Sequence, residues 1–212
     1  MNSWTALHSA SSYGNLGALK ALLSHPGITV NKKTLCGRTA LHTLFLTGRS
    51  SRNKDGCQVS LLIFQALLEH PSIDINATIV SGGGTTPLHL ACRCGRADLV
   101  EALLQHSSRV NVNALAPQFV RGASHSFIIA CSYNHWHVVR VLLGCPLLDP
   151  ASVGWGYRQA NALKNHAVAM LIEVHWLGLQ PLPLTDFHCS HDQRDLKLSQ
   201  EAAVMKLSEE PH

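Results

Sequence analysis

The sequence lacks any run of about 18 apolar residues, so it predicts no membrane-spanning helix. Its first residues, Met-Asn-Ser-Trp-Thr, have neither the basic stretch nor the apolar stretch of a secretory signal peptide. The seven cysteines are an odd number, and their spacing is not that of a disulfide framework. We therefore expect a cytoplasmic or nuclear protein whose thiols are free.

Signatures of catalysis and of metal binding are also missing. The glycine run Gly82–Gly84 has no Lys-Ser/Thr after it, which a phosphate-binding loop requires. There is no H-E-x-x-H motif, and Cys92 and Cys94 are separated by one residue where a zinc pair needs at least two. No set of nucleophile, base and acid can be recognised. We therefore expect no enzyme activity, no cofactor and no metal site.

Charge is modest and unevenly distributed. The net charge of the chain is +4, and aromatic residues make up only 6% of it. A basic surface without interleaved aromatic residues is not typical of a nucleic-acid-binding protein, so we expect no nucleic-acid partner. Residues 177–212 carry three basic and six acidic side chains, a net charge of −3, which leaves +7 on residues 1–176.

A short motif recurs along the chain. Thr5-Ala6-Leu7-His8 is followed 34 residues later by Thr39-Ala40-Leu41-His42, and Thr86-Pro87-Leu88-His89 follows after a further 47. In each copy a glycine lies six residues after the histidine, and a Leu-Leu pair closes the unit. A weaker copy runs from His125 to Leu143, with Asn134 in place of the glycine.

Each copy predicts two short helices joined by a tight turn. Threonine is a good N-cap, and Pro87 occupies the first helical position, where proline is tolerated. Gly95 ends the first helix because glycine enters the left-handed region without steric cost. Leu99, Val100, Leu103 and Leu104 then recur at helical spacing. A helix pair of this size cannot bury its apolar face without a neighbour.

A repeat near 33 residues with T-P-L-H-x-A resembles the ankyrin-repeat family. The resemblance implies an all-α repeat fold, a solenoid of helix-turn-helix units joined by β-hairpin loops. We expect an ankyrin-repeat domain at residues 3–176, with repeats at about 3–34, 37–80, 84–115 and 123–151 and a degenerate cap at 154–176. Residues 177–212 are expected to form an acidic, disordered tail.

The second repeat holds about eleven more residues between its glycine and its Leu-Leu pair than the first and third do. The extra residues fall within Arg49–Gly56 and its flanks, which are polar and rich in turn formers. The sequence therefore predicts an exposed loop at about residues 49–59. This loop is either a basic contact site or a tolerated surface insertion.

Ankyrin proteins bind protein partners on a concave face made of the first helices and the hairpin loops. By this resemblance the chain is a monomeric adaptor or interaction module, and its basic array favours a partner with an acidic segment. The candidate partner-binding residues lie on three successive hairpins: Lys32, Lys33, Leu35 and Arg38 on the first, Ile79 on the second, and Phe119, Val120 and Arg121 on the third.

The resemblance also assigns roles to repeated polar residues. It implies that His8, His42 and His89 hydrogen-bond to the motif threonine and to the neighbouring repeat. His25, His70 and His106 are expected to meet the last carbonyls of the second helices as cationic donors. Three hairpin asparagines, Asn31, Asn76 and Asn113, resemble sites of asparaginyl hydroxylation, or are turn formers that tolerate left-handed geometry.

An alternative function comes from the end of the array. Some ankyrin proteins end in a SOCS box, which recruits a ubiquitin-ligase scaffold through an elongin-binding helix. Leu163, Ala167 and Leu171 have the four-residue spacing of that helix, and Leu182-Pro183-Leu184 resembles its Leu-Pro-x-Pro segment. Under this alternative the chain is a substrate-recognition subunit of a ubiquitin ligase.

Overall fold

The computed structural model describes residues 3–45, 54–79, 81, 83–120 and 122–178. The chain divides into two compact units, Met1–Ile172 and Glu173–His212. Only Glu173–Gly178 of the second unit is described, and these residues continue and end the last helix. None of the helices in the described residues is long and apolar enough to cross a membrane.

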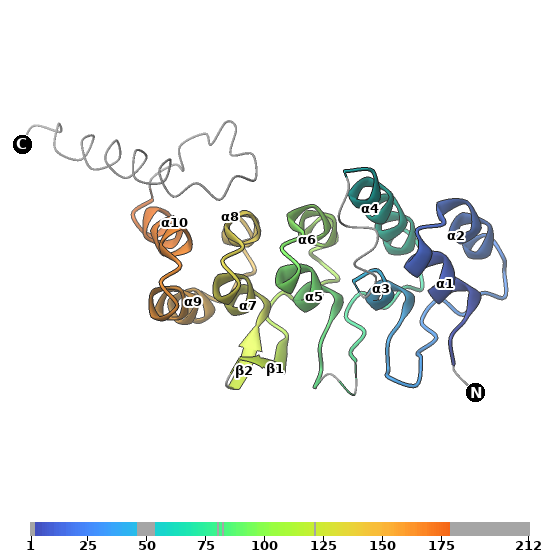
Figure 1. Cartoon of the computed structure of the whole chain (residues 1–212), viewed down its shortest axis with the longest axis horizontal. Helices are drawn as coiled ribbons and strands as arrows, with labels where there is room; N and C mark the ends of the chain where they lie inside the picture. Colours follow the sequence, from blue (N-terminus) through green and yellow to red (C-terminus); the bar gives the residue numbers. More distant parts are fainter. Residues whose placement is uncertain (1–2, 46–53, 80, 82, 121, 179–212) are drawn as a thin grey trace, which may run out of the picture. The chain divides into compact units, whose positions relative to one another are not determined.

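The described residues form helix pairs separated by extended connections (Figure 1). The pairs are α1 (Ala6–Tyr13) with α2 (Leu16–Leu23), α3 (Ala40–Thr43) with α4 (Lys54–Leu68), α5 (Pro87–Arg93) with α6 (Ala97–Leu104), α7 (Ser126–Ser132) with α8 (Trp136–Leu143), and α9 (Pro150–Ala162) with α10 (His166–Trp176). The all-α repeat fold predicted from the motif is confirmed.

The helix starts and stops follow the motif. Thr5 and Thr86 are N-caps in extended conformation, and each side chain accepts from the backbone N–H of the histidine three residues later. After the first helices the backbone turns through the left-handed region, at Gly14 (φ 75°) and Gly95 (φ 69°). Asn134 (φ 57°) makes the same turn in the fourth pair, as its tolerance of this region predicts.

Two features of the pairs differ from the sequence prediction. Helix α4 begins at Lys54, so the segment expected to be a loop at 49–59 is helical from that residue onward. Residues 49–53 lie outside the described residues. Helix α9 begins at Pro150, ahead of residue 154, and the left-handed residue that ends the pair's first helix is Lys164 (φ 59°).

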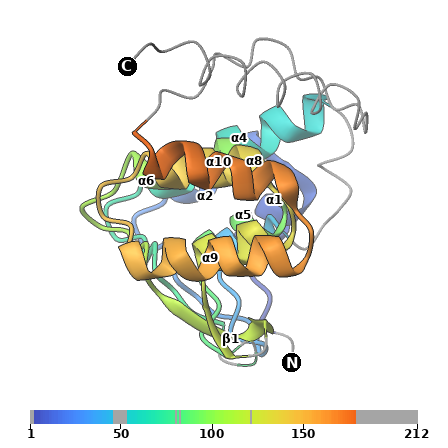
Figure 2. The same ribbon diagram turned by 90° about the vertical axis from the view of Figure 1, so that its left-hand side faces the viewer.

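The helices of unit Met1–Ile172 lie in two layers. In one layer α1 packs against α3, α3 against α5, α5 against α7 and α7 against α9. In the other, α2 packs against α4, α4 against α6 and α6 against α8. Figure 2 shows these layers one above the other, with the connections extending below the first.

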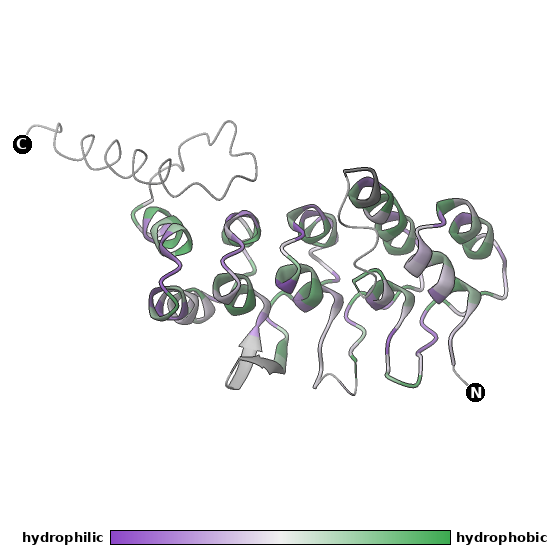
Figure 3. Ribbon diagram, viewed as in Figure 1, coloured by the Kyte–Doolittle hydropathy of each residue, from purple (hydrophilic) through white to green (hydrophobic). Residues whose placement is uncertain are grey.

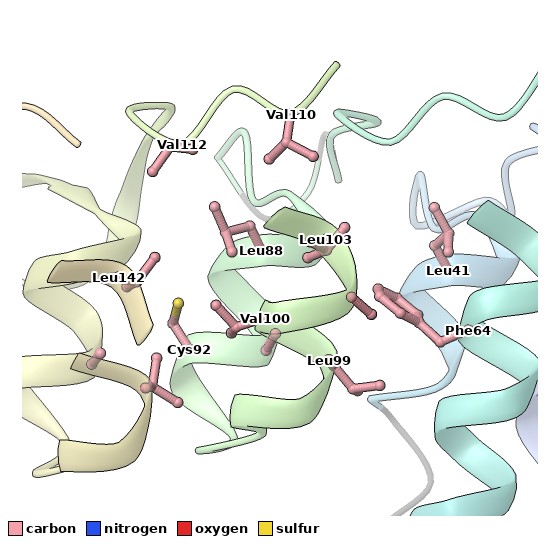
Figure 4. Close-up of a cluster of buried hydrophobic side chains, with 14 of the residues drawn as sticks. Leu41, Phe64, Leu88, Cys92, Leu99, Val100, Leu103, Val110, Val112 and Leu142 are labelled. Atoms are coloured by element: carbon pink, nitrogen blue, oxygen red, sulfur yellow. The ribbon is translucent and has the colours of Figure 1, made fainter. Parts of the chain in front are cut away.

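The core runs along the array between successive pairs. Figure 4 shows Phe64 of α4, Leu103 of α6 and Leu142 of α8 directed into this interior, and all three are fully buried. Because every central pair is covered on both sides, its apolar residues lose nearly all contact with water. Of the apolar stripe predicted for the third pair, Leu99, Val100 and Leu103 are buried, whereas Leu104 is only half-buried.

The first three connections between pairs are hairpins, which we call fingers: the first at residues 31–38, the second at 76–85 and the third at 113–125. The first is closed by Thr34 N–H donating to the Arg38 carbonyl at 2.8 Å. An antiparallel bridge joins Ile79 to Thr85 in the second. In the third, β1 (Leu115–Val120) pairs antiparallel with β2 (Gly122–His125). Figure 3 shows a hydrophobic tip on the first finger.

Candidate binding surface

In the first and third helix pairs the motif histidine connects the pair to the finger that follows it. The backbone N–H of Thr5 donates to His8 Nδ1 at 3.1 Å, and His8 Nε2 lies 3.0 Å from the carbonyl oxygen of Arg38. In the third pair, His89 Nε2 lies 3.0 Å from the carbonyl oxygen of Ala114. The role implied by the family resemblance is confirmed for these two residues, and it anchors the base of a finger to a helix.

Burial favours the neutral form of two motif histidines, His8 and His42. Burial lowers the pKa of His8, although backbone groups of Arg38 and Lys32 oppose the shift. His42 is fully buried, and burial lowers its pKa to about 4 against the opposing effect of the Thr85 and Ala77 backbone groups. A neutral imidazole can accept from the threonine at one nitrogen and donate to a carbonyl with the other.

The finger asparagines form a second set of links between repeats. Asn76 Nδ2 donates to the Arg109 carbonyl at 2.7 Å, and Asn111 N–H donates to Asn76 Oδ1 at 2.8 Å. Asn31 makes the same pair of bonds to Ser72 and Asp74, and Asn113 makes it to Leu147 and Asp149. All three lie in turns, as predicted, but not in left-handed geometry, because in the described part of the chain only Asn134 and Lys164 among non-glycine residues have positive φ.

A third set lies at the turn between the two helices of a pair. The residue after the left-handed position donates to a carbonyl of the preceding pair: Arg96 to Cys57 at 3.1 Å and Asn165 to Cys131 at 2.8 Å. His135 Nε2 likewise lies 3.0 Å from the Arg93 carbonyl. The first two sets of bonds fix the fingers, and the third joins successive helix pairs at the turns between their helices.

The first finger presents most of the predicted surface. Lys32 and Lys33 are exposed, Leu35 is 73% exposed and Arg38 is half-buried. Lys33 Nζ donates to the Thr78 carbonyl of the second finger at 3.3 Å. The structure therefore brings four predicted site residues together on one hairpin that is tied to its neighbour.

The second and third fingers fit the prediction less well. Ile79 is only 6% exposed, so it is a packed residue and does not belong to the accessible surface. Successive residues of an extended strand face opposite sides, so Ala77 and Ile79, which are two residues apart, face the same side, and both are buried. Phe119 and Val120 lie in β1, where only the backbone is described, and Arg121 lies outside the described residues.

Sequence reasoning missed Leu115, which is 53% exposed at the start of the third finger. It follows Asn113 by two residues, as Thr78 follows Asn76 and Lys33 follows Asn31. The offset from the asparagine was the signal that could have identified it. At this position the three fingers present a lysine, a threonine and a leucine in turn.

Other histidines and cysteines take part in backbone hydrogen bonds or in core packing. His25 and His70 accept through Nδ1 from the N–H groups of Gly27 and Ser72, so their predicted role as cationic donors to helix carbonyls is wrong. Cys92 and Cys131 are buried, as predicted, and burial raises the pKa of both thiols. Among the described residues no group of three or more His, Cys, Asp or Glu is placed to hold a metal ion.

The helix required by the ubiquitin-ligase alternative is not formed. Leu163 is the C-cap of α9 and is 48% exposed, whereas Ala167 and Leu171 belong to α10. Left-handed Lys164 separates them, so the four-residue spacing does not lie on one helix face. The segment Leu182–Leu184 lies outside the described residues.

Comparison with known proteins gives a consistent result. A model of the family described as ankyrin repeats in three copies matches residues 32–115 and 56–153, and one described as ankyrin repeats in many copies matches residues 7–52. Over 106 residues the chain is 32% identical to the SMC5-SMC6 complex localization factor protein 1 of Bos taurus and, at the same identity and length, to that of Homo sapiens. This match covers 50% of the chain and only 9% of each relative's length.

Proposed function

Because the chain belongs to the ankyrin-repeat family of protein-interaction modules, we propose that it is a non-catalytic, monomeric adaptor that binds a protein partner through its fingers. The binding surface is centred on the first finger, with Leu35 as its anchor and Lys32 and Lys33 beside it. It continues to the second finger at Thr78 and to the third at Leu115.

This proposal rests on the exposure of Leu35, which lies on a hairpin that hydrogen bonds fix in place. A leucine that is 73% exposed would be covered by a partner, and burying it would gain about 1.5 to 3 kcal/mol. The finger is closed by the bond between Thr34 and Arg38, and Ser81 Oγ donates to the Cys36 carbonyl at 2.9 Å from the second finger. Little ordering entropy is therefore lost when the partner binds.

The charges favour an acidic partner segment with an apolar residue. Two exposed lysines precede Leu35, and residues 1–176 carry a net charge of +7. Charges at the rim of such a surface act on the association rate and on partner choice more than on affinity. We place the protein in the cytoplasm or the nucleus. A recruiting role is consistent with the name of its relatives, which are localization factors.

The test is proximity labelling with the full chain in cells. A variant with Lys32→Glu and Leu35→Asp is compared with Lys20→Glu, which changes an exposed lysine on α2 away from the fingers. We expect the finger variant to lose the specifically labelled proteins and the α2 variant to retain them. If both variants label the set that the unaltered chain labels, the fingers are not the binding surface.

A further inference from the structure

In the third, fourth and fifth pairs, the turn between the two helices carries an exposed side chain. Cys94, Tyr133 and Leu163 are the C-caps of α5, α7 and α9, and each precedes the left-handed residue of its turn. Tyr133 is 49% exposed, Leu163 is 48% exposed, and Cys94 is exposed as well. We call these three side chains the turn strip. Cys94 and Tyr133 belong to pairs with a neighbour on both sides, so their exposure does not depend on where the array ends.

Hydrogen bonds between successive turns place the strip on one edge of the array. His135 Nε2 lies 3.0 Å from the Arg93 carbonyl at the end of α5, and Asn165 Nδ2 donates to the Cys131 carbonyl near the end of α7 at 2.8 Å. The ends of α5 and α7 therefore lie beside the next turn. Figure 2 shows the turn between α9 and α10 at the right-hand ends of these helices, whereas the fingers extend below. The turn strip is thus separate from the fingers to which the proposed function assigns partner binding.

Tyr133 stands on a rigid support. Its ring is nearly parallel to that of His135, with an interplanar angle of 10° and a centroid separation of 6.1 Å. The His135 ring lies against the preceding turn, because a Cβ on Gly95 would come within 2.7 Å of its Nδ1 atom. An exposed tyrosine that is already held in one orientation loses little side-chain entropy when a partner covers it. Tyrosine is also one of the residues that most often anchor interfaces.

The charges around the turn strip favour an acidic partner. Between Glu101 and Glu173 the sequence has only one acidic residue, Asp149, which caps the opposite end of α9. Arg140 of α8 and Lys164 in the next turn are both exposed. The first turns of α8 and α10 hold no acidic residue, so no carboxylate of either turn offsets the partial positive charge of these helix N-termini.

The spacing of the turn strip indicates the conformation of its partner. Packed helices lie about 8 to 10 Å apart, so the strip offers one side chain at each such interval. A polyproline II helix has three residues per turn and rises about 3.1 Å per residue, so its every third side chain lies on one face about 9 Å apart. In a β-strand, residues three apart face opposite sides. An α-helix, which rises about 1.5 Å per residue, would meet the strip with only one residue in seven.

We propose that the turn strip binds a proline-rich, acidic segment of a partner protein in polyproline II conformation, with an apolar residue at every third position. The central apolar residue packs on the Tyr133 ring, as proline-rich segments do on aromatic surfaces. The acidic residues between the apolar ones face Arg140 and Lys164. Single-stranded nucleic acid fits less well, because Cys94 and Leu163 offer no flat ring on which a base can stack.

The first test is fluorescence anisotropy of the full chain with a labelled peptide of three Leu-Pro-Glu triplets. We expect saturable binding that Tyr133→Ala weakens about tenfold or more, because the central contact is lost. Tyr13→Ala is the matched control and should leave the affinity unchanged. Tyr13 is 79% exposed and also precedes a left-handed glycine, but it lies in the first pair. Both tyrosines are exposed, so neither variant should change the melting temperature. Absence of binding, or an equal loss in the two variants, would overturn the proposal.

Altered ligands test the spacing and the charge. A peptide of the same composition with irregularly placed leucines should bind about tenfold more weakly, and Leu-Pro-Gln triplets should bind about fivefold more weakly at low salt. Equal binding of the irregular peptide, or tighter binding of an amphipathic helical peptide, would contradict the polyproline II conformation. An oligothymidylate that binds more tightly than the triplet peptide and displaces it would assign the strip to nucleic acid, and the proposal would be wrong.

The finger variant with Lys32→Glu and Leu35→Asp separates this inference from the proposed function. It should bind the triplet peptide as tightly as the unaltered chain does, because the fingers do not form the turn strip. If this variant lost the peptide and Tyr133→Ala retained it, the peptide would bind at the fingers and the turn strip would not be its site.

Discussion

At the scale of single residues, position in the repeat decides what a side chain does. Gly154 and Gly156 lie two residues apart in α9. A Cβ added at Gly154 would meet nothing within 4 Å, whereas one at Gly156 would lie 2.5 Å from the Phe127 ring and 2.9 Å from Cys131 Sγ. The second glycine allows α9 to approach α7 closely, and the first has no such role.

The same substitution at these two glycines should therefore have opposite effects. Gly154→Ala should raise the free energy of unfolding by up to about 1 kcal/mol, since alanine is the better helix former. Gly156→Ala gains the same propensity but overpacks against a fully buried ring, which costs about 1 to 3 kcal/mol. Urea unfolding of both variants measures the difference. Equal changes of one sign would contradict the close contact between α7 and α9.

His42 predicts a pH dependence of stability. Its pKa is about 4 in the folded chain and near 6.5 when unfolded, so the unfolded state binds more protons between these values. The contribution of His42 to the free energy of unfolding is complete above pH 6.5 and is lost as the pH falls toward 4. It amounts to at most about 3 kcal/mol. Burial also lowers the pKa of His8 and His137, which adds to the trend.

Urea titrations at intervals from pH 7.5 to pH 4 test this dependence. His42→Gln removes the titrating group, so the free energy of unfolding should fall less steeply with acidification in the variant than in the unaltered chain. The residual slope then belongs to the other titrating residues. Identical slopes would mean that His42 is not buried in its neutral form.

At the scale of elements, the sequence predicted those parts whose signals are local. Thr86 as cap, Gly95 as stop and Leu103 as core residue follow from their own neighbours in the chain. The start of α4 was missed because Lys54–Gly56 are polar and a glycine disfavours a helix. The carbonyl of Cys57 in its first turns accepts from Arg96, 39 residues away. A bond between residues so far apart in the sequence cannot be predicted from local periodicity.

The candidate site shows the same limit. The exposure of Lys32, Lys33 and Leu35 was predicted correctly because charge and exposure at a finger follow from composition and turn position. Ile79 was misplaced because one residue of register decides whether a hairpin side chain faces inward. The asparagine bonds were missed for a third reason, since each joins residues more than 30 positions apart.

The packing of α6 between α4 and α8 gives an element-scale prediction. Leu103 is fully buried in this layer, so Leu103→Ala should lower the free energy of unfolding by about 2 to 5 kcal/mol. Leu104→Ala is the matched control, because its side chain is only half-buried and its loss should be clearly smaller. Circular dichroism during urea unfolding measures both, and similar losses would contradict the helix register.

At the scale of the whole molecule, the stability of an array depends on the coupling between neighbouring repeats. Each asparagine contributes two hydrogen bonds to that coupling, on the finger side of the array. Because the fingers carry the proposed binding surface, the same bonds that stabilise the array also set the spacing of Lys33, Thr78 and Leu115. Weakening one should therefore affect cooperativity as well as total stability.

Asn76→Ala tests this coupling at the centre of the array. It leaves the Arg109 carbonyl and the Asn111 N–H without their partner, so the free energy of unfolding should fall by about 1 to 3 kcal/mol. The denaturant dependence should also become shallower, because the repeats on either side unfold less tightly coupled. Asn161→Ala is the control, since Asn161 donates only to Tyr157 within its own helix and is exposed. Because alanine favours the helix, that variant should be as stable as the unaltered chain or slightly more so. If the two variants lost stability equally, the effect would come from removing an amide side chain and the links between repeats would carry no coupling.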